Sequence, residues 1–421
     1  MARPADPTLE WPTHPRLKPA LRRAWRSRDT VQFGITPAHA VAVGPLDTAT
    51  GSFIYLLDGT RGLPLLRQEA QAMGLPAGRA DSVVARLVAA GLIEDSLAGG
   101  GTTSAVRSDA RARDRLRADQ AALSVLHPDP SAGLRLLGAR RATRVQVRGA
   151  GRVGSSVAAL LSAAGVGQVD VMDGGYVEPW DVLPGGLSPE QIGERRDTAA
   201  RRLVRSAAPA RRTSRAASPA SSARGASPAP AACGTAGPSC GVAASAGHGA
   251  SADPCGPDLV VIAPRDGLAA YAPEPDAAEQ LMSAKVPHLY AGVLEGTGVV
   301  GPLVLPGITC CAGCMAARRA EREPGWPRML AQWRSGRQTP VPACDAALAT
   351  VVAGYTAAQV LALLDGGTPP SVGARLELTL PGLAWDVRPI EPHPSCVCGA
   401  MTTSVTRYSS DGEEPQATMS G

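Results

Sequence analysis

The segment "VRGAGRVGSSVAALLSAAGVGQVDVMDGG" at residues 147–175 constrains the fold more than any other part of the chain. A strand pattern runs into three glycines, Gly149, Gly151 and Gly154, spaced G-x-G-x-x-G, and a helical pattern follows at once. In such a unit the first glycine permits a tight turn, the second lets a phosphate approach the backbone, and the third lets helix pack on strand. The helix start adds unpaired N–H groups that can hold a phosphate. The segment therefore predicts a nucleotide-binding α/β unit.

A second strand pattern, "QVDVMDGG", ends in Asp173, about 20 residues after the loop, where a ribose-binding carboxylate is expected. Further strand patterns and a long apolar helical pattern predict a mostly parallel α/β sheet; they lie at 144–149, 257–264, 286–293, 298–307 and, for the helix, 345–367. A dehydrogenase would open in the same way, and a glycine-rich turn without a ligand is a further alternative. The loop alone does not identify the nucleotide.

Two close cysteine pairs lie far apart in the sequence. They are Cys311-x-x-Cys314 and Cys396-x-Cys398. Two such pairs can fill the four corners of a tetrahedral structural Zn²⁺ site. Cys310 is an alternative ligand, and chance among nine cysteines is the alternative interpretation.

Residues 20–97 predict a small winged-helix-like module. Strand patterns at 30–35 and 40–44 are followed by three short helical patterns, with Asp47 and Asp81 as N-caps and Gly91 at the end of the last helix. The predicted arrangement has a flexible lead-in before this module and a linker after it; these are residues 1–19 and 98–107.

The larger domain is predicted at 108–400, with a helix at 111–126 and an insertion at 206–257. The insertion is nearly all Ala, Ser, Pro, Gly and Arg, and cannot bury enough apolar surface to offset the entropy of ordering it. We therefore expect it to be disordered. A second metal site within it is the alternative, since it contains Cys233, Cys240, Cys255 and His248. A flexible tail is expected at 401–421.

The chain has a glycine loop, then an acidic residue, then two cysteine pairs. In this order of motifs it resembles the ThiF/MoeB/HesA family, the adenylating domain of ubiquitin-activating enzymes. The resemblance covers about residues 130–400. "VEPWDVLPG" shares Val177 and Glu178 with the family's motif after the second strand, and "DLVVIAPRDG" places Asp266 at its magnesium-binding aspartate. The resemblance implies a Rossmann-like ThiF-type fold, ATP and Mg²⁺ as ligands, Zn²⁺ on the four cysteines and a homodimer.

The family's catalytic arginine and lysine are missing here. Pro184 and Gly185 stand where the arginine belongs, and the segment "QIGERRDTAARRL" has no lysine. Arg195 and Arg196 are the nearest candidates for the charge-stabilising role, although a guanidinium is no simple replacement for an ammonium. Cys344, at a predicted helix start, is either a thioester nucleophile or a small buried residue.

Two functions remain open. The first is an adenylyltransferase that activates the C-terminal carboxylate of a ubiquitin-like carrier, sulfur carrier or peptide. The second is a non-catalytic scaffold that binds a leader peptide for a partner cyclodehydratase, because a winged-helix-like module ahead of a ThiF-like domain resembles the peptide-recognition element of ribosomal-peptide modification systems.

Composition argues against other classes of partner. The net charge of +5 is small for 421 residues, and aromatic residues make up only 3%, so we expect no nucleic-acid partner. The sequence shows neither an unbroken apolar run of membrane-spanning length nor a signal-peptide pattern at its start. We therefore expect no membrane partner and a cytoplasmic location, where nine cysteines favour metal binding or free thiols over disulfides.

Overall fold

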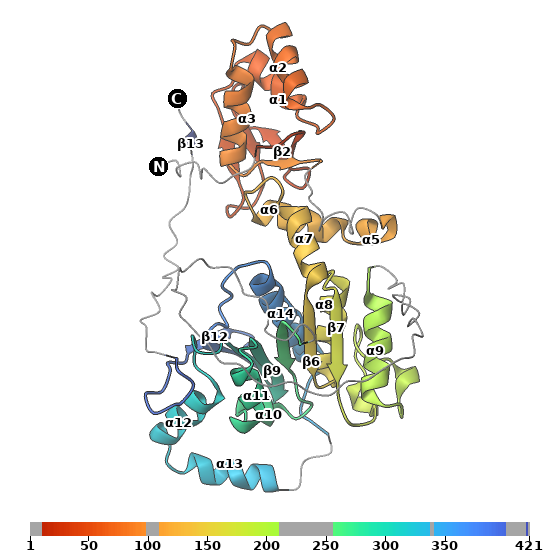
Figure 1. The fold of residues 1–421 in the computed structure, drawn as a ribbon, viewed down its shortest axis with the longest axis vertical. Coiled ribbons are helices and arrows are strands. Elements are labelled where there is room, and N and C mark those ends of the chain that lie inside the picture. The colour runs from red at the N-terminus through yellow and green to blue at the C-terminus, as the bar shows by residue number, and fades with distance from the viewer. Residues whose placement is uncertain (1–10, 98–108, 210–255, 337–340, 401–417, 420–421) are drawn as a thin grey trace, which may run out of the picture.

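The computed structural model describes residues 11–97, 109–209, 256–336, 341–400 and 418–419. Figure 1 shows two parts along the long axis: a small N-terminal module and a larger α/β domain, joined by helices α5 to α7. Most of the insertion predicted at 206–257 lies outside the described residues, as do its three cysteines and His248.

The N-terminal module forms a small sheet covered by three helices. Strands β2, β3 and β4 pair antiparallel, and helices α1 to α3 follow them in the chain. The bounds are Arg23–Trp25 for β2, Val31–Phe33 for β3, Val41–Val43 for β4, Thr48–Tyr55 for α1, Leu63–Ala72 for α2 and Arg79–Ala89 for α3. Phe53, Leu66 and Leu87 are at most 2% exposed in its core. These residues supply the apolar face that each short element buries, so the module has its own core.

Most of the predicted local signals of this module are confirmed, and one is wrong. Asp47 caps α1 by accepting from the backbone N–H of Thr50 at 2.6 Å, and Gly91 follows α3 at φ +69°. Asp81 does not cap α3, because the chain enters that helix through Gly78 at φ +79°. Asp81 lies instead in the first turn and pairs with Arg67.

Four strands in this region, β1, β2, β5 and β13, were not predicted from the sequence. β1 (Pro15–Leu17) pairs antiparallel with β5 (Ile93–Asp95), so part of the lead-in expected to be flexible is structured. β13 (Thr418–Met419), near the end of the chain, pairs parallel with β4. Strands of two or three residues carry too little alternation to be read from sequence.

Helices α5 (Ala110–Arg115), α6 (Arg117–Leu126) and α7 (Ala132–Ala142) connect the two parts. The helix predicted at 111–126 is confirmed, except that it breaks at Leu116. At the end of α7, the guanidinium of Arg140 meets the carboxylate of Asp365 with Nε–Oδ1 and Nη2–Oδ2 distances of 2.8 and 2.5 Å. Both side chains are less than 10% exposed, so this bidentate pair ties the connector to the larger domain.

A seven-stranded sheet in the order β12-β11-β10-β9-β8-β6-β7 forms the larger domain. Strands β7, β6, β8 and β9 run parallel, while β9 to β12 are antiparallel neighbours. The predicted parallel α/β sheet is thus confirmed in the half that carries the glycine loop, and an antiparallel half extends it. In chain order the strand bounds are Arg144–Arg148 for β6, Gln168–Met172 for β7, Leu259–Ile262 for β8, His288–Leu294 for β9, Thr297–Val304 for β10, Ala374–Thr379 for β11 and Trp385–Pro389 for β12.

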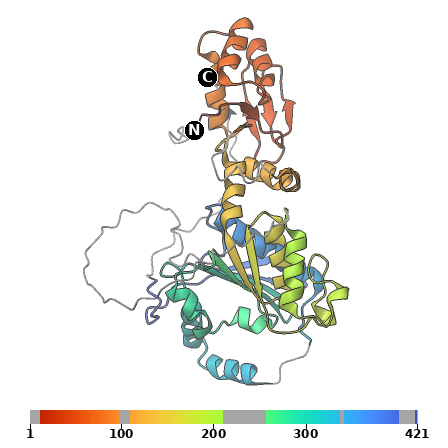
Figure 2. The same cartoon turned by 45° about the vertical axis from the view of Figure 1, so that its right-hand side comes forward.

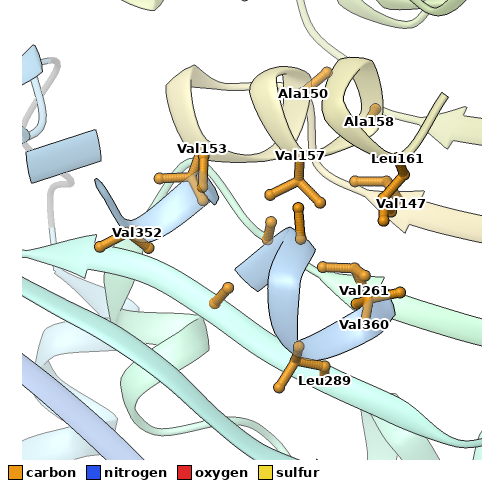
Figure 3. Packing of buried hydrophobic residues seen from close by; sticks show 14 of the residues in the cluster. Val147, Ala150, Val153, Val157, Ala158, Leu161, Val261, Leu289, Val352 and Val360 are labelled. Carbon is orange, nitrogen blue, oxygen red and sulfur yellow. The ribbon is translucent and has the colours of Figure 1, made fainter. Parts of the chain in front are cut away.

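Helices cover both faces of this sheet (Figure 2). One face packs against α8 and α14, and Figure 3 shows their apolar side chains, such as Val157 and Val360, against Val261 and Leu289. The opposite face carries α10 to α13. The bounds are Arg152–Ala163 for α8, Arg196–Ala207 for α9, Gly267–Tyr271 for α10, Glu279–Ser283 for α11, Ala312–Arg322 for α12, Trp326–Ser335 for α13 and Ala346–Leu364 for α14.

Among the described residues, α14 is the one helix long and apolar enough to cross a membrane by length and composition. It is not an unbroken apolar run, because Thr350, Thr356 and Gln359 interrupt it. Val352 and Val360 of this helix are fully buried in the core between the sheet and α8. Its apolar composition is therefore accounted for by packing.

The buried pair between α7 and α14 gives a stability prediction. Asp365→Ala leaves the Arg140 guanidinium buried without a counter-charge, and we expect a loss of about 3–5 kcal/mol in the free energy of unfolding. Urea unfolding followed by circular dichroism measures it. The double variant Arg140→Met/Asp365→Leu should recover most of the loss, and an undiminished loss in the double variant would contradict the electrostatic explanation.

Candidate active site

The glycine loop connects β6 to α8 by a backbone path that only glycine allows at two positions. Gly149 has φ +105°, and a Cβ there would lie 2.0 Å from the carbonyl oxygen of Ala263. A Cβ at Gly154 would lie 2.1 Å from the carbonyl oxygen of Gly149. The first glycine thus permits the turn and close contact with the strand end of β8, and the third lets α8 approach the loop. Gly151 is the N-cap residue of α8.

Asp173 lies against this loop, at the end of β7. Its carboxylate accepts hydrogen bonds from the backbone N–H of Ala150 at 2.8 Å, from that of Gly175 at 2.9 Å and from Arg196 Nε at 2.8 Å. The Asp173 side chain is only 8% exposed. Burial acts to raise its pKa, but these bonds outweigh burial and hold the pKa below the usual value. The structure brings the predicted acidic residue and the glycine loop together, with Asp173 ionised.

A chain of ion pairs continues from Asp173. Arg196 also approaches Asp181 at 3.4 Å, and Arg265 Nε donates to Asp181 at 2.8 Å. The Asp181 side chain is 2% exposed, and its Oδ2 also accepts from the backbone N–H of Glu178 at 2.9 Å. Asp181 thus holds two arginines and the short 3-10 turn Pro179–Asp181 in place.

The two predicted arginines differ in position. Arg196 is among the ion pairs beside the loop, with its side chain 12% exposed. Arg195 is the N-cap residue of α9, is 55% exposed at its side chain, and pairs with Asp197 at 3.3 Å. Only Arg196 is brought to Asp173.

Two further arginines were missed by sequence reasoning. Arg152 Nη1 donates to the carbonyl oxygen of Cys344 at 2.6 Å. Arg265 lies over Gly151, where an added Cβ would be 3.3 Å from Arg265 Cγ. Within the described chain, Arg152 Nε and Arg265 Nη2 are buried without a hydrogen-bond partner. No local signal in the sequence singles out either residue. Arg152 occupies an unspecified position of the glycine motif, and Arg265 is far from the loop in sequence and reaches it only because β8 pairs with β6.

Asp266 directly follows Arg265 and caps α10 through a bond from the N–H of Leu268 at 3.0 Å. The residue is exposed. Since Arg265 contacts Gly151, Asp266 lies at the same edge of the sheet as the glycine loop. One carboxylate oxygen accepts the capping bond, which leaves the other available for a cation.

Cys344 does not have the features of a nucleophile. Asp345, not Cys344, is the N-cap residue of α14. Burial raises the pKa of the Cys344 thiol, and the nearby Arg152 only partly opposes this. The interpretation of Cys344 as a small structural residue is therefore favoured, although it is only partly buried against the core.

The four predicted cysteines come together into one cluster between α12 and the C-terminal segment. Their sulfurs all lie within 4.8 Å of one another, with Cys311–Cys314, Cys311–Cys396 and Cys314–Cys398 at 3.9, 3.5 and 3.5 Å. A tetrahedral ion with metal–sulfur bonds of about 2.3 Å needs sulfurs about 3.8 Å apart. The spacing fits such an ion. Cys310, the alternative ligand, is buried nearby but is not part of the four-sulfur group.

Comparison with known proteins confirms the predicted resemblance. Residues 130–244 match the ThiF family. A search of the curated proteins finds no match.

Solved structures show the same fold at low sequence identity. E. coli MccB crystallised with succinimide has a TM-score of 0.58 and 14% identity, covering 91% of this chain and 98% of MccB. MccB with ATP has a TM-score of 0.57 and 15% identity, covering 91% and 99%. The heterocyclase TruD has a TM-score of 0.55 and 15% identity; the match covers 92% of this chain and 43% of TruD.

The environment of Asp173 predicts a pH dependence. Because its pKa is lowered on folding, the ionised carboxylate stabilises the fold above the ordinary Asp value of 3.8, and this contribution is lost as the pH falls through the lower folded-state value. We expect Asp173→Asn to be less stable than wild type at pH 7, with the difference shrinking below about pH 4. Urea unfolding at several pH values tests this; a constant difference down to pH 3 would contradict it.

Proposed function

We propose that this chain, which carries a ThiF family domain, binds ATP and adenylates the C-terminal carboxylate of a peptide. One observation carries the proposal most strongly. The glycine loop and the ionised Asp173 are hydrogen-bonded to each other, and three arginines, Arg152, Arg196 and Arg265, surround them.

The loop and Asp173 would bind different parts of ATP. Backbone N–H groups at the start of α8 can hold phosphate oxygens without a charged side chain. A carboxylate has about four acceptor positions, and Asp173 uses three of them for Ala150, Gly175 and Arg196. The fourth can accept from a ribose hydroxyl.

In the proposed reaction, a carboxylate oxygen of the peptide forms a bond to the α-phosphorus of ATP. The bond from that phosphorus to the bridging oxygen of the β-phosphate breaks, and pyrophosphate leaves with the electron pair. Negative charge grows on the leaving group, so fixed cations stabilise the transition state. Arg196 is held in place by Asp173 and Asp181, while Arg152 and Arg265 each have a guanidinium nitrogen free to bind a phosphate oxygen.

We propose that Asp266 holds Mg²⁺, since its exposed carboxylate keeps one oxygen free of the capping bond. When bound, Mg²⁺ neutralises phosphate charge. Arg195 has a lesser part in this scheme than Arg196, because its guanidinium is engaged with Asp197 at the surface.

The complexes in which similar proteins were solved support a peptide as substrate. MccB was crystallised with ATP, and separately with AMPCPP and MccA. We propose a precursor peptide, with a ubiquitin-like or sulfur-carrier protein as the alternative substrate. From the family resemblance we further propose a homodimer. From the composition and the apolar pattern of the sequence we propose a cytoplasmic location and a partner that is neither nucleic acid nor membrane.

A specific observation favours a second candidate function, the leader-binding scaffold. β13, from the far end of the chain, pairs with the outer edge of β4 in the N-terminal module. This edge therefore accepts an extended segment, which is how a leader peptide would bind by strand addition. In that case the module would present the peptide to a partner cyclodehydratase.

We also propose that Cys311, Cys314, Cys396 and Cys398 hold one Zn²⁺. The sulfur spacing and the all-cysteine donor set fit this ion. The ion would fasten residues 396–398 to α12, since the pairs come from these two segments. Its role is structural, because four protein ligands leave no open position.

Titration calorimetry and exchange kinetics test the nucleotide proposal. We expect weak ATP binding that Gly151→Val and Asp173→Ala abolish, because the first fills the space beside Arg265 and the second removes the acceptor. Candidate peptides should support ATP–pyrophosphate exchange, which Arg196→Met should slow by about a hundredfold or more. Arg195→Met is the matched control and should have a smaller effect. ATP binding without exchange for any peptide would favour the scaffold; no heat at millimolar ATP would contradict the nucleotide site.

The zinc proposal is tested by metal analysis. Purified protein should contain about one equivalent of zinc, and Cys396→Ser should lose it with a fall in melting temperature. Cys310→Ser is the control, because Cys310 lies outside the four-sulfur group, and it should keep the metal. Metal-free wild-type protein with an unchanged melting temperature would overturn the proposal.

A further inference from the structure

A cavity of about 350 Å³ lies between α12, α13 and strands β11 and β12. Its walls belong to the sheet face opposite α8 and α14, because Leu378 of β11 packs into that core while Glu377 lines the cavity. Figure 2 shows α12 and α13 on the side of the sheet away from α8. The proposed nucleotide-binding groups do not include any of its lining residues.

The charge of the lining is strongly unbalanced. It contains one acidic residue, Glu377, and six arginines: Arg318, Arg319, Arg322, Arg334, Arg375 and Arg388. Glu377 is shared, since both Arg375 and Arg388 approach it, at 3.4 and 3.2 Å. Arg322 forms no ion pair within the described parts of the chain; its Nε donates to the carbonyl oxygen of Arg318. The other arginines of the lining also pair with acidic residues just outside it; these pairs are Arg318–Glu391, Arg319–Glu323, Arg334–Glu274 and Arg388–Asp386. The least compensated cations of the cavity are therefore Arg322, which has no acidic partner among the described residues, and Arg375, which shares Glu377.

Three of these guanidinium groups each have one buried nitrogen that forms no hydrogen bond within the described parts of the chain. The Nε atoms of Arg318, Arg319 and Arg375 are buried and have no hydrogen-bond partner among the described residues. The Arg375 side chain is only 16% exposed. Buried donors without partners are costly, and an anion in the cavity would satisfy them.

The walls also indicate the kind of anion. Met315, Leu330 and Ile390 contribute apolar surface. The rings of Trp326 and Tyr271 are each covered on one face by an arginine, Arg319 at 4.3 Å and Arg375 at 4.5 Å. Those ring faces are not open to a nucleotide base. A carboxylate on a short aliphatic stem fits this mixture of cations and apolar surface better than a nucleotide.

Helix α10 connects the cavity to the proposed reaction site. Asp266 caps its N-terminus, and Tyr271 at its last residue lines the cavity. Five residues of helix advance about 7.5 Å, and two residues of extended peptide advance about 7 Å. A peptide whose C-terminus lies near Asp266 would thus place the side chain two residues upstream at the cavity.

We propose that this cavity is a specificity site for an acidic side chain of the peptide substrate, about two residues before the carboxylate that is activated. The inference rests on the proposed function. Arg322 and Arg375 bind the acidic group, and the apolar walls contact its methylene groups and its neighbours.

Fluorescence anisotropy with the full chain tests the proposal. The probes are two peptides, fluorescein-Ala-Leu-Glu-Leu-Gly and the same sequence with Gln in place of Glu. We expect the Glu peptide to bind at least tenfold more tightly, as for a charge-assisted hydrogen bond. Arg322→Ala, an exposed position, should remove about tenfold of the affinity for the Glu peptide and leave the Gln peptide unchanged. Arg375→Met should do the same if its melting temperature shows that it folds.

Arg135→Ala is the matched control, because this exposed arginine on α7 pairs with Asp129 outside the cavity. It should leave the affinities for both peptides unchanged. If Arg135→Ala lost as much affinity for the Glu peptide as Arg322→Ala, the loss would reflect the net charge of the protein, and this would contradict the proposal. Equal binding of the two peptides to wild type would overturn the proposal, as would displacement of the Glu peptide by inorganic phosphate below the peptide's Kd. The ATP titration is independent: discrimination between the peptides without ATP binding would uphold the cavity and refute the nucleotide site.

Discussion

The hydrogen bonds that Asp173 accepts from the N–H groups of Ala150 and Gly175 and from Arg196 connect the glycine loop, the end of β7 and α9. These three segments are separated in sequence, and Asp173 is the single group they share. Because the side chain is nearly buried, each donor also offsets the cost of placing a carboxylate there. The second carboxylate, Asp181, extends the same connection to Arg265 at the end of β8. A series of ion pairs, Asp173–Arg196–Asp181–Arg265, thus holds together the edge of the sheet at which the parallel strands end.

The sequence predicted those parts of the site whose geometry depends on residues close together in the chain. Gly149 and Gly154 must be glycine because the carbonyl oxygens of Ala263 and Gly149 occupy the space of a Cβ, so their spacing reveals the turn. The cysteine pairs were equally readable, since Cys311-x-x-Cys314 fixes two sulfurs on one helix start. The long strands and α14 followed from apolar runs that only burial explains.

The rest depended on contacts between segments distant in sequence. Nothing near Arg152 or Arg265 in the sequence distinguishes them from the many other arginines of this chain; their place beside the loop follows from how β6 and β8 pair. Arg195 and Arg196 are neighbours, yet the start of α9 turns only one of them to Asp173. β1 and β5 gain stability from pairing across nearly eighty residues, which no local signal reports. Features set by neighbouring residues could therefore be predicted from the sequence, and features set by contacts between distant segments could not.

Whether this edge catalyses or only binds depends on its cations. A phosphate can be held by backbone N–H groups alone, but departure of pyrophosphate needs fixed positive charge where negative charge develops. Arg196 is bound to two carboxylates, which hold it rigidly and also neutralise much of its charge. Arg152 is bonded only to a carbonyl oxygen among the described groups, so its charge is less compensated. Arg265 shares Asp181 with Arg196 and keeps one buried nitrogen free. The positive charge that the two carboxylates leave uncompensated is thus greatest at Arg152 and Arg265, two residues that the family's motif does not specify, and these would act together with the rigidly held Arg196 in place of the missing arginine and lysine.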